Sequence, residues 1–469
     1  MNAPLPNQAI RKPIAAAMLE SLKALFGDRL SLAEAVRDQH GRDESPYPPL
    51  PPDAVVFAHS TDEVAALVRL AVAHRVPLIP YGVGTSLEGH LLALEGGISV
   101  DLSQMNQVIA VNPEDLTVTV QAGVTRKQLN TEIRDTGLFF PIDPGADATI
   151  GGMAATRASG TNAVRYGTMR ENVLALTVVT GEGKVVRTAR RARKSSAGYD
   201  LTRLFVGSEG TLGIITEITL KLYPQPEAIS AATCSFPTVE AAVRTTIETI
   251  QLGVPIARCE LLDALTVKAV NARNGLGLPE MPMLLFEFHG SAAGVAEQAE
   301  TVQAIAREHG AAAFEWASKP EDRSRLWEAR HNAYFACLQL KPGCRSFTTD
   351  VCVPISRLAE CITETISDTA RSPLPAPILG HVGDGNFHCA ILADPTRPDE
   401  LEEAERLNGR IVARALAMDG TCTGEHGVGM HKMDFLRDEH GDDALELMAR
   451  IKRSFDPQNI LNPGKIVRV

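Results

Sequence analysis

Two histidines flank an Asp-Gly pair in the segment His381-Val382-Gly383-Asp384-Gly385-Asn386-Phe387-His388. Asp-Gly favours a two-residue type I′ turn, because both central residues of that turn need a positive φ. A turn at Asp384-Gly385 would pair His381 with His388 on adjacent strands, with Cβ atoms about 5 Å apart on one face. Two imidazoles at that separation can bind one divalent metal ion. The alternative is a cross-strand pair of core histidines.

A second group of metal-capable and basic side chains follows in Gly424-Glu425-His426-Gly427-Val428-Gly429-Met430-His431. Neighbouring side chains of a strand point to opposite faces, so Glu425 and His426 can share a site only in an irregular loop, which the glycines permit. We predict that His381, His388 and Glu425 bind the metal, leave positions open for substrate, and have His426 beside them as general base. Zn²⁺, Mn²⁺ and Fe²⁺ all tolerate this ligand set. We expect His431 to be a surface or supporting group.

Length and composition limit the class of protein. The chain has 469 residues, enough for two or three domains, and its net charge of -11 argues against a nucleic-acid binder. The eight cysteines form no C-x-x-C pair, so we expect reduced thiols. No apolar run reaches the roughly 20 residues of a spanning helix, and the N-terminus lacks a signal-peptide core. We therefore expect a cytoplasmic protein, with peripheral docking at the inner membrane left open.

Hydrophobic periodicity predicts an α+β architecture in both halves of the chain. A proline-rich break at 46–52 separates an N-terminal helical arm from the main body. Pro224-Gln225-Pro226-Glu227 is the predicted domain boundary. One helix is expected to follow Thr61, which would be its N-cap. Other helices are expected at 14–25, 238–251, 293–309, 324–340, 355–371 and 398–418. Strands are expected at 76–80, 174–179, 184–187, 231–236, 257–261, 283–288 and 311–316. The basic run from Arg187 to Lys194 is interpreted as a solvated loop.

Three loops combine glycine with serine or threonine: 82–86, which follows a predicted strand, 144–153 continuing to Ser159-Gly160, and 207–215. Such loops let the backbone approach a phosphate closely while hydroxyls complete the hydrogen bonds. The first loop is no dinucleotide fingerprint, because Leu87 stands where that motif needs glycine. Three ordinary tight turns are the alternative, but three such loops in one domain favour a phosphate-containing cofactor.

The same loops carry a resemblance to a known family. Residues 50–225 resemble the FAD-binding domain of the vanillyl-alcohol-oxidase or p-cresol methylhydroxylase type, and 226–469 resemble that family's C-terminal cap. The matching segments are 80–86, 149–152, 198–201, 207–213, 381–388, 424–427 and 456–465. Within the family, Trp327-Glu328-Ala329-Arg330-His331-Asn332-Ala333 and 349–358 are similar to the FAD-dependent D-lactate dehydrogenases of the cytochrome type.

The resemblance implies an α+β fold. An N-terminal arm (1–49) precedes an FAD-binding domain of two α/β subdomains (50–225). A cap (226–469) follows, with an antiparallel sheet covered by helices and a tail that returns to the flavin. FAD is expected to be non-covalent, because Thr85 and Ser86 stand where some members carry a linking histidine. The expected FAD contacts are Pro80, Tyr81, Gly82, Val83, Gly84, Thr85, Ser86, Pro144, Gly145, Ala146, Thr149, Gly151, Gly152, Ser159, Gly160, Gly207, Glu209, Gly210, Gly213, Ile214, Ile215 and Asn462.

The resemblance also implies a reaction, the oxidation of D-lactate to pyruvate by hydride transfer to flavin N5. In that reaction a metal polarises the hydroxyl, His426 takes its proton, and Arg330 binds the carboxylate bidentately. Tyr334 would lie one helical turn beyond Arg330. The substrate residues are therefore Arg330, Tyr334, His381, His388, Glu425 and His426. An ordinary helix salt bridge is the alternative for Arg330.

Other substrates and roles stay open. Glycolate or D-2-hydroxyglutarate is the alternative substrate, although the lack of a basic residue near Thr348 favours a monocarboxylate. Cytochrome c, a quinone or an electron-transfer flavoprotein would reoxidise the flavin, and a homodimer is an option. Two further classes are a flavin subunit of an electron-transfer complex and a metallohydrolase. The latter leaves the three glycine-rich loops unexplained.

Overall fold

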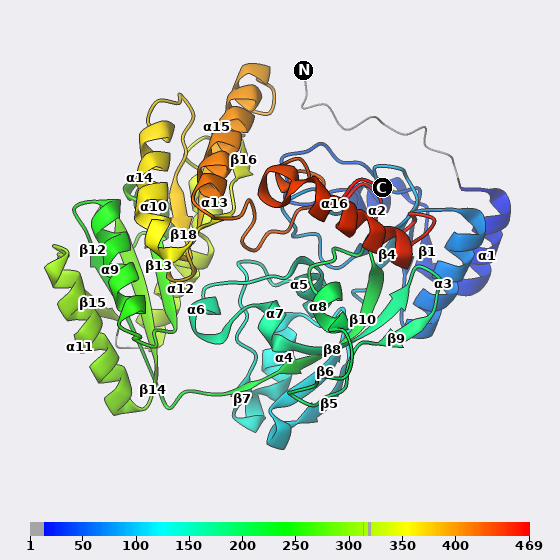
Figure 1. Ribbon diagram of the computed structural model, residues 1–469, viewed down its shortest axis with the longest axis horizontal. Coiled ribbons are helices and arrows are strands. Elements are labelled where there is room, and N and C mark those ends of the chain that lie inside the picture. Colours follow the sequence, from blue (N-terminus) through cyan, green and yellow to red (C-terminus); the bar gives the residue numbers. More distant parts are fainter. Residues whose placement is uncertain (1–13, 313, 318–319) are drawn as a thin grey trace. The chain divides into compact units, whose positions relative to one another are not determined.

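The computed structural model describes residues 14–312, 314–317 and 320–469, and its internal contacts divide the chain into two units (Figure 1). Unit 1 comprises Gly160–Tyr166 and Pro226–Gly424. Unit 2 comprises the described part of Leu5–Ser159 together with Gly167–Gln225 and Glu425–Val469. The chain thus changes unit next to Pro226, and again inside the glycine-rich segment that carries Glu425 and His426.

Unit 2 begins with a four-stranded sheet of order β1-β2-β4-β3, in which β2, β4 and β3 are parallel and β1 is antiparallel. Its strands are β1 (Leu30–Ser31), β2 (Ala54–Phe57), β3 (Leu78–Tyr81) and β4 (Ile98–Asp101). The accompanying helices are α1 (Ala16–Phe26), α2 (Glu34–His40) and α3 (Thr61–His74). Met18 and Leu22 of α1 are fully buried in one core with Leu67 of α3, so this arm packs as part of unit 2. The predicted cap at Thr61 is wrong, because the Ser60 hydroxyl accepts the N–H of Glu63.

The second sheet of unit 2 has five antiparallel strands in the order β5-β6-β10-β8-β9. They are β5 (Val108–Asn112), β6 (Thr117–Gln121), β8 (Val173–Thr180), β9 (Val185–Arg187) and β10 (Gly213–Lys221). The predicted hairpin of β8 and β9 is confirmed. A short ladder joins β7 (Leu138–Phe139) to β11 (Tyr223–Pro224). The helices are α4 (Arg126–Ile133), α5 (Ile150–Thr156), α7 (Met169–Asn172), α8 (Leu201–Phe205) and α16 (Phe435–Phe455). The basic run beyond Arg187 lies in an exposed loop.

Unit 1 is built on an eight-stranded antiparallel sheet of order β15-β12-β14-β13-β18-β19-β16, with β17 paired to β19. Its strands are β12 (Ala228–Ser235), β13 (Arg258–Leu262), β14 (Met283–Gly290), β15 (Phe314–Ala317), β16 (Arg345–Thr348), β17 (Val351–Cys352), β18 (Ile378–Gly380) and β19 (Asn386–Ala393). The strand predicted at 311–316 begins later, at Phe314; Ala313 lies outside the described residues.

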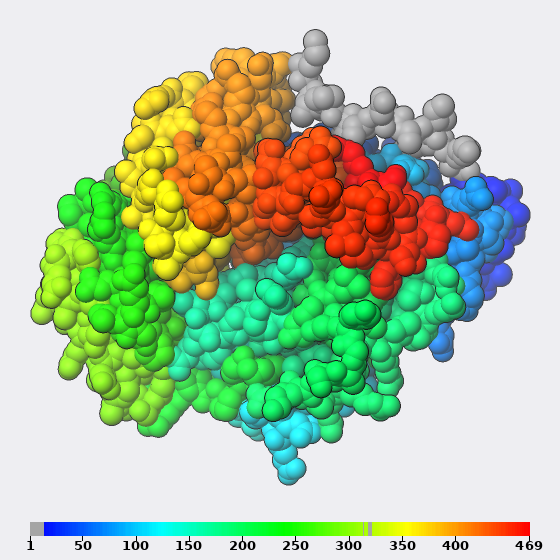
Figure 2. Space-filling view, viewed as in Figure 1, coloured from blue at the N-terminus to red at the C-terminus, as the bar shows by residue number. Residues whose placement is uncertain are grey.

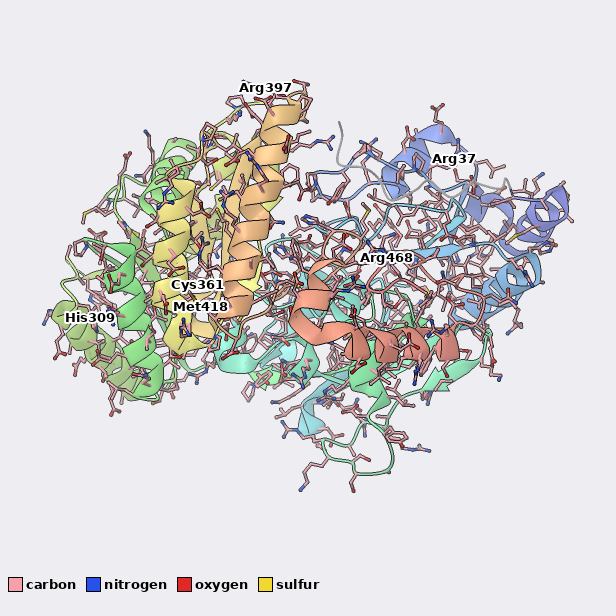
Figure 3. All side chains as sticks on the ribbon, turned by 45° about the horizontal axis from the view of Figure 1, so that its top comes forward. Arg37, His309, Cys361, Arg397, Met418 and Arg468 are labelled. Atoms are coloured by element: carbon pink, nitrogen blue, oxygen red, sulfur yellow. The ribbon has the colours of Figure 1, made fainter. Side chains whose placement is uncertain are left out.

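Helices pack on both faces of this sheet. One group is α9 (Val239–Gln251), α11 (Ala292–Glu308), α14 (Leu358–Thr369) and α15 (Pro398–Ala417), and the other is α10 (Ala264–Asn274), α12 (Pro320–His331) and α13 (Ala333–Leu338). The space-filling view shows α14 and α15 in yellow and orange (Figure 2). In Figure 3, Arg397 and Met418 mark the two ends of α15, and Cys361 lies on α14. The two helices are joined by Arg410 and Asp368 at 3.0 Å.

The sequence predicted one helix over 324–340, and this is wrong. Asn332, with φ -88° and ψ 4°, separates α12 from α13. Arg330 and Tyr334 therefore lie on different helices, and the expectation that one continuous helix places them a turn apart on one face fails. Among the residues that the structure describes, no helix combines the length and the apolar composition that crossing a membrane requires.

Candidate functional site

The segment His381–His388 connects β18 to β19 in unit 1, but not through the predicted turn. Residues Val382–Asp384 form a 3-10 turn, and only Gly385 has a positive φ, at 82°. A type I′ turn needs a positive φ at two residues, so it cannot form here. His388 pairs with Leu379 rather than with His381. The amide of Asn386 donates to the His381 carbonyl at 3.3 Å and closes the connection.

The two imidazoles nevertheless meet. Their ring centroids lie 5.4 Å apart with the planes at 85°, and the two residues are 8 % and 6 % exposed. Nδ1 of His381 lies 2.8 Å from Oε1 of Glu260, and Nδ1 of His388 lies 3.2 Å from the Thr349 carbonyl oxygen. A carbonyl or an ionised carboxylate can only accept, so each Nδ1 carries the proton. In the neutral imidazole Nε2 then keeps its lone pair, which is the form of histidine that binds a metal.

Glu260 on β13 is fully buried and contacts a second charged group. Its Oε2 lies 2.5 Å from Nη2 of Arg330, which is itself 7 % exposed. This contact lacks hydrogen-bond geometry and is best described as a close ion pair. Nε of Arg330 has no hydrogen-bond partner among the described residues. The salt-bridge alternative for Arg330 is thus present, with a partner on a strand rather than on its own helix.

Asp350, which precedes β17, is the other buried carboxylate of this part of unit 1. Its Oδ1 accepts from Nδ2 of Asn386 at 3.0 Å, and its Oδ2 accepts from the Thr423 hydroxyl at 2.8 Å. Oδ1 also lies 3.6 Å from Nδ1 of His388. The backbone carbonyl of Asp350 accepts the N–H of Gly424, the last residue of unit 1. Asp350 therefore fixes the chain immediately before Glu425.

In unit 2 the three glycine-rich loops converge. A Cβ added to Gly82 would lie 2.5 Å from the Thr149 hydroxyl, and one added to Gly210 would lie 2.8 Å from Pro80. The amides of Gly207 and Glu209 donate at 2.9 Å to the carbonyls of Ala154 and Ala155 on α5. The loops that follow β3 and α8 thus lie against the N-terminal and C-terminal parts of α5, respectively. Their backbones come closer than residues with side chains would allow.

The other residues that were predicted to contact FAD lie outside the loop contacts just described. Ile214 and Ile215 are buried in β10, opposite Val179 and Val178. Residues 144–146 lie in the connection before the cap residue Thr149. The chain leaves unit 2 between Ser159 and Gly160. The described residues therefore place the three loops together, while Gly160 is grouped with unit 1.

Asn462 joins the C-terminal segment to these loops. Its N–H donates to the Leu78 carbonyl at 2.8 Å, and its side-chain amide donates to the carbonyls of Glu209 and His90 at 2.8 and 3.2 Å. Ser208 Oγ and His90 Nδ1 are buried without a hydrogen-bond partner among the described residues. Polar atoms of a bound FAD would satisfy such groups, so this cradle fits the cofactor.

Two buried carboxylates hold the loop that carries His426. Glu209 accepts the amides of Val428 and Gly429 at 2.7 and 2.8 Å. Glu88 accepts from Nδ1 of His426 at 3.3 Å. Glu88 also accepts from Nδ1 of His431 at 2.7 Å and lies 2.9 Å from Nζ of Lys432. The His431 side chain is only 8 % exposed, so His431 is a supporting group and the surface alternative for it is wrong.

Electrostatics keep the Glu88 carboxylate charged. Burial alone would raise the pKa of Glu88, but the Lys432 ammonium and the hydrogen bonds from His426 and His431 hold it well below its usual range. Burial would lower the pKa of His90, but the Glu209 carboxylate raises it overall. Since Glu88 is an acceptor, His426 donates to it through Nδ1 and presents Nε2 as the basic nitrogen.

Sequence reasoning missed Glu260, Asp350 and Glu88. Strand alternation could have placed Arg258 and Glu260 on one face of β13, because residues i and i+2 of a strand share a face. That face is confirmed by the guanidinium of Arg258, 4.5 Å from the Trp327 ring centroid on α12. No local signal links Glu88 to His426, which lies 338 positions later.

Comparison with known proteins gives two family matches along the chain. Residues 52–189 match the FAD binding domain family, and residues 225–466 match the C-terminal domain family of FAD linked oxidases. The chain is 53 % identical over 456 residues to a probable mitochondrial D-lactate dehydrogenase of Danio rerio, covering 96 % of this chain and 92 % of the relative. It is 47 % identical over 458 residues to a mitochondrial D-lactate dehydrogenase [cytochrome] of Arabidopsis thaliana, covering 97 % and 81 %.

A solved structure of p-cresol methylhydroxylase superposes with a TM-score of 0.81 at 18 % identity, over 98 % of each chain. At that identity the match shows the fold alone, which is the α+β flavoprotein fold that the sequence predicted. The family matches, the full-length relatives and the convergent glycine-rich loops lead to one conclusion: the chain belongs to the FAD-linked oxidase family of flavoproteins.

Proposed function

We propose that this flavoprotein oxidises D-lactate to pyruvate. The observation that carries the proposal is the 53 % identity to a relative named D-lactate dehydrogenase, which extends over 96 % of the chain. That span includes the imidazoles of unit 1 and the cofactor loops of unit 2. Positions 346–356, which include Thr348, hold no basic residue, and this supports a monocarboxylate over D-2-hydroxyglutarate. Glycolate is the remaining alternative.

FAD would be held in unit 2 by the glycine-rich loops 80–86, 149–152 and 207–213, with Asn462 beside them. Their glycines leave room for backbone approach to the pyrophosphate. When bound, the flavin would supply the redox chemistry, as the acceptor of a hydride from C2 of the substrate. The remaining work of positioning and proton transfer falls to side chains of the chain itself.

One divalent metal would be held by His381 and His388 through Nε2 and by Glu425. The two Nδ1 hydrogen bonds support this assignment, because in a neutral imidazole they leave the lone pair on Nε2 for the metal. Glu425 directly follows Gly424, whose amide is bonded to the Asp350 carbonyl. Such a metal would polarise the substrate hydroxyl and lower its pKa. The ligand types fit Zn²⁺, Mn²⁺ or Fe²⁺.

Arg330 would bind the substrate carboxylate. Its guanidinium is buried, and Nε lacks a hydrogen-bond partner among the described residues, so it retains a donor for a carboxylate oxygen. Tyr334 stays a proposed substrate contact from the start of α13. His426 would take the hydroxyl proton on Nε2, since Glu88 and Glu209 hold its loop and its Nδ1 donates to Glu88.

Electrons would then pass from the flavin to an external acceptor. The name of the Arabidopsis relative includes the word cytochrome, which supports a cytochrome as the acceptor. A quinone or an electron-transfer flavoprotein is the alternative. A flavin subunit without turnover of its own would not need the buried Arg330 and the held His426. Turnover of the purified chain with an artificial dye therefore separates the two functions.

The test is the visible spectrum of the purified protein under argon, before and after addition of D-lactate, L-lactate, glycolate or D-2-hydroxyglutarate. We expect flavin bands that bleach with D-lactate and not with L-lactate. Faster bleaching by glycolate or D-2-hydroxyglutarate would mean that this acid, and not D-lactate, is the substrate. A yellow protein that bleaches with none of these acids would contradict the proposed reaction and leave the family assignment intact.

A further inference from the structure

We propose that Glu260 is a positioning residue that serves both halves of the site in unit 1. One carboxylate oxygen orients His381 for metal binding, and the other holds Arg330 for the substrate carboxylate. The inference deepens the proposed function and rests on its metal site. Glu260 does not itself contact metal or substrate in this scheme.

The contact with His381 fixes the tautomer of the imidazole. Oε1 of Glu260 lies 2.8 Å from Nδ1, and the carboxylate is fully buried. An ionised carboxylate can only accept, so Nδ1 carries the hydrogen and Nε2 the lone pair. A carboxylate bonded to the far nitrogen of a ligand histidine also increases the basicity of the ligating nitrogen. In the corresponding place His388 has the Thr349 carbonyl at 3.2 Å and the Asp350 carboxylate only at 3.6 Å, so His381 has the closer carboxylate partner of the two histidines.

The contact with Arg330 balances charge. Oε2 of Glu260 lies 2.5 Å from Nη2, and the arginine is more than nine-tenths buried. A buried guanidinium without a counter-charge would disfavour a divalent cation in the same unit, because like charges repel strongly at low dielectric. Glu260 removes that conflict while leaving Nε of Arg330 unbonded. One side chain therefore couples the metal ligand to the carboxylate-binding residue.

The chain provides a matched control on the next strand. Glu287 on β14 is 5 % exposed, and its Oε1 lies 2.8 Å from Nε2 of His289. Glu287 also lies 3.5 Å from an arginine, Arg258. This carboxylate has the same kind of partners as Glu260, but neither partner is a proposed ligand. A general effect of removing a buried carboxylate from the sheet would appear in both variants.

The experiment measures zinc affinity of the FAD-loaded full-length protein, by competition with a chromophoric chelator after metal removal. The variants are Glu260→Gln, Glu260→Asp, His381→Ala and Glu287→Gln, and near-ultraviolet circular dichroism checks their folding. We expect Glu260→Gln to weaken zinc binding by about 10- to 100-fold, as loss of such an outer carboxylate does elsewhere. Glu260→Asp should restore part of the affinity, and Glu287→Gln should bind as the wild type does. The KM for D-lactate should rise in Glu260→Gln, because Arg330 loses its partner.

Unchanged zinc affinity in Glu260→Gln, together with loss of zinc in His381→Ala, would overturn the role of Glu260 and leave the metal site standing. Unchanged affinity in both would overturn the metal site and the inference together. An equal loss in Glu260→Gln and Glu287→Gln would show a general structural effect and also overturn the inference. If Glu260→Gln does not fold, Glu260→Asp decides: weaker zinc binding supports the inference, and wild-type binding overturns it.

Discussion

The imidazole rings of His381 and His388 lie 5.4 Å apart and nearly perpendicular, although the two residues are not paired on the ladder of β18 and β19. The 3-10 turn between them brings the rings together instead. Both Nδ1 atoms face oxygen acceptors, so the neutral form of each imidazole has its lone pair on Nε2.

Removal of the metal should abolish turnover without removing FAD. A chelator such as 1,10-phenanthroline should reduce the rate of D-lactate oxidation while the flavin bands persist, because the two histidine ligands lie in unit 1 and the cofactor loops in unit 2. Added Zn²⁺ or Mn²⁺ should restore the rate, and His388→Ala should bind neither ion stoichiometrically. Full activity in chelator, with no metal found by elemental analysis, would contradict the metal site.

His426→Gln should lower kcat by about 10²- to 10⁴-fold, the usual contribution of a general base. Stopped-flow reduction of the flavin by D-lactate is the direct measurement, because it isolates the step in which the hydroxyl proton leaves. His431→Gln is the matched control, since His431 also donates to Glu88 but has no proposed part in proton transfer. Equal losses in both variants would indicate that the Glu88 cluster acts only in stability.

Arg330→Lys should raise the KM for D-lactate roughly 10- to 100-fold, because a point charge replaces a planar fork that binds a carboxylate bidentately. Steady-state kinetics with a dye acceptor measure it. Arg323→Lys, on the same helix, changes a residue that bonds only the Ile229 carbonyl in the described structure and should leave KM unchanged. A fall in kcat at constant KM in Arg330→Lys would assign the residue to another step.

Gly82→Ala should reduce the FAD content of the purified protein. The added Cβ would lie 2.5 Å from the Thr149 hydroxyl, which forces the loop after β3 away from the N-terminus of α5. Gly82 is not among the glycines with positive φ, so the effect is steric rather than conformational. Gly409→Ala on α15 is the control, because its Cβ would meet nothing within 4 Å. Wild-type flavin content in Gly82→Ala would remove this loop from the cofactor site.

The buried ammonium of Lys465 should make stability increase with pH. Burial lowers the pKa of Lys465 from 10.5 to about 8, while its Nζ donates to the Leu92 carbonyl. Between those values the unfolded chain holds a proton that the folded chain lacks, so the free energy of unfolding rises with pH. From pH 8 to 10.5, the free energy of unfolding of the wild type should rise by up to about 3 kcal/mol relative to that of Lys465→Met. Denaturant unfolding measures it, and a difference independent of pH would contradict the prediction.

Much of the fold and cofactor region could be predicted from the sequence, because its signals are local. Glycines beside hydroxyl residues mark the three loops, and the hairpin of β8 and β9 follows from alternation around Gly181-Glu182-Gly183. The proximity of His381 and His388 also needs only a short connection. The type of that connection was wrong, since Asp384 adopts a 3-10 turn and Gly385 alone takes a positive φ.

Only the tertiary structure decided which acids support the histidines. Glu260 lies 121 positions before His381, and Glu88 lies 338 positions before His426, so no local pattern connects them. Their pairing depends on burial, because a carboxylate removed from water must find a donor or a cation. The tertiary structure likewise divides the predicted helix at Asn332 and pairs Arg330 with a strand residue. The sequence by itself thus determined the loops, the histidines and their order along the chain, while long-range packing determined the charged partners that fix each histidine.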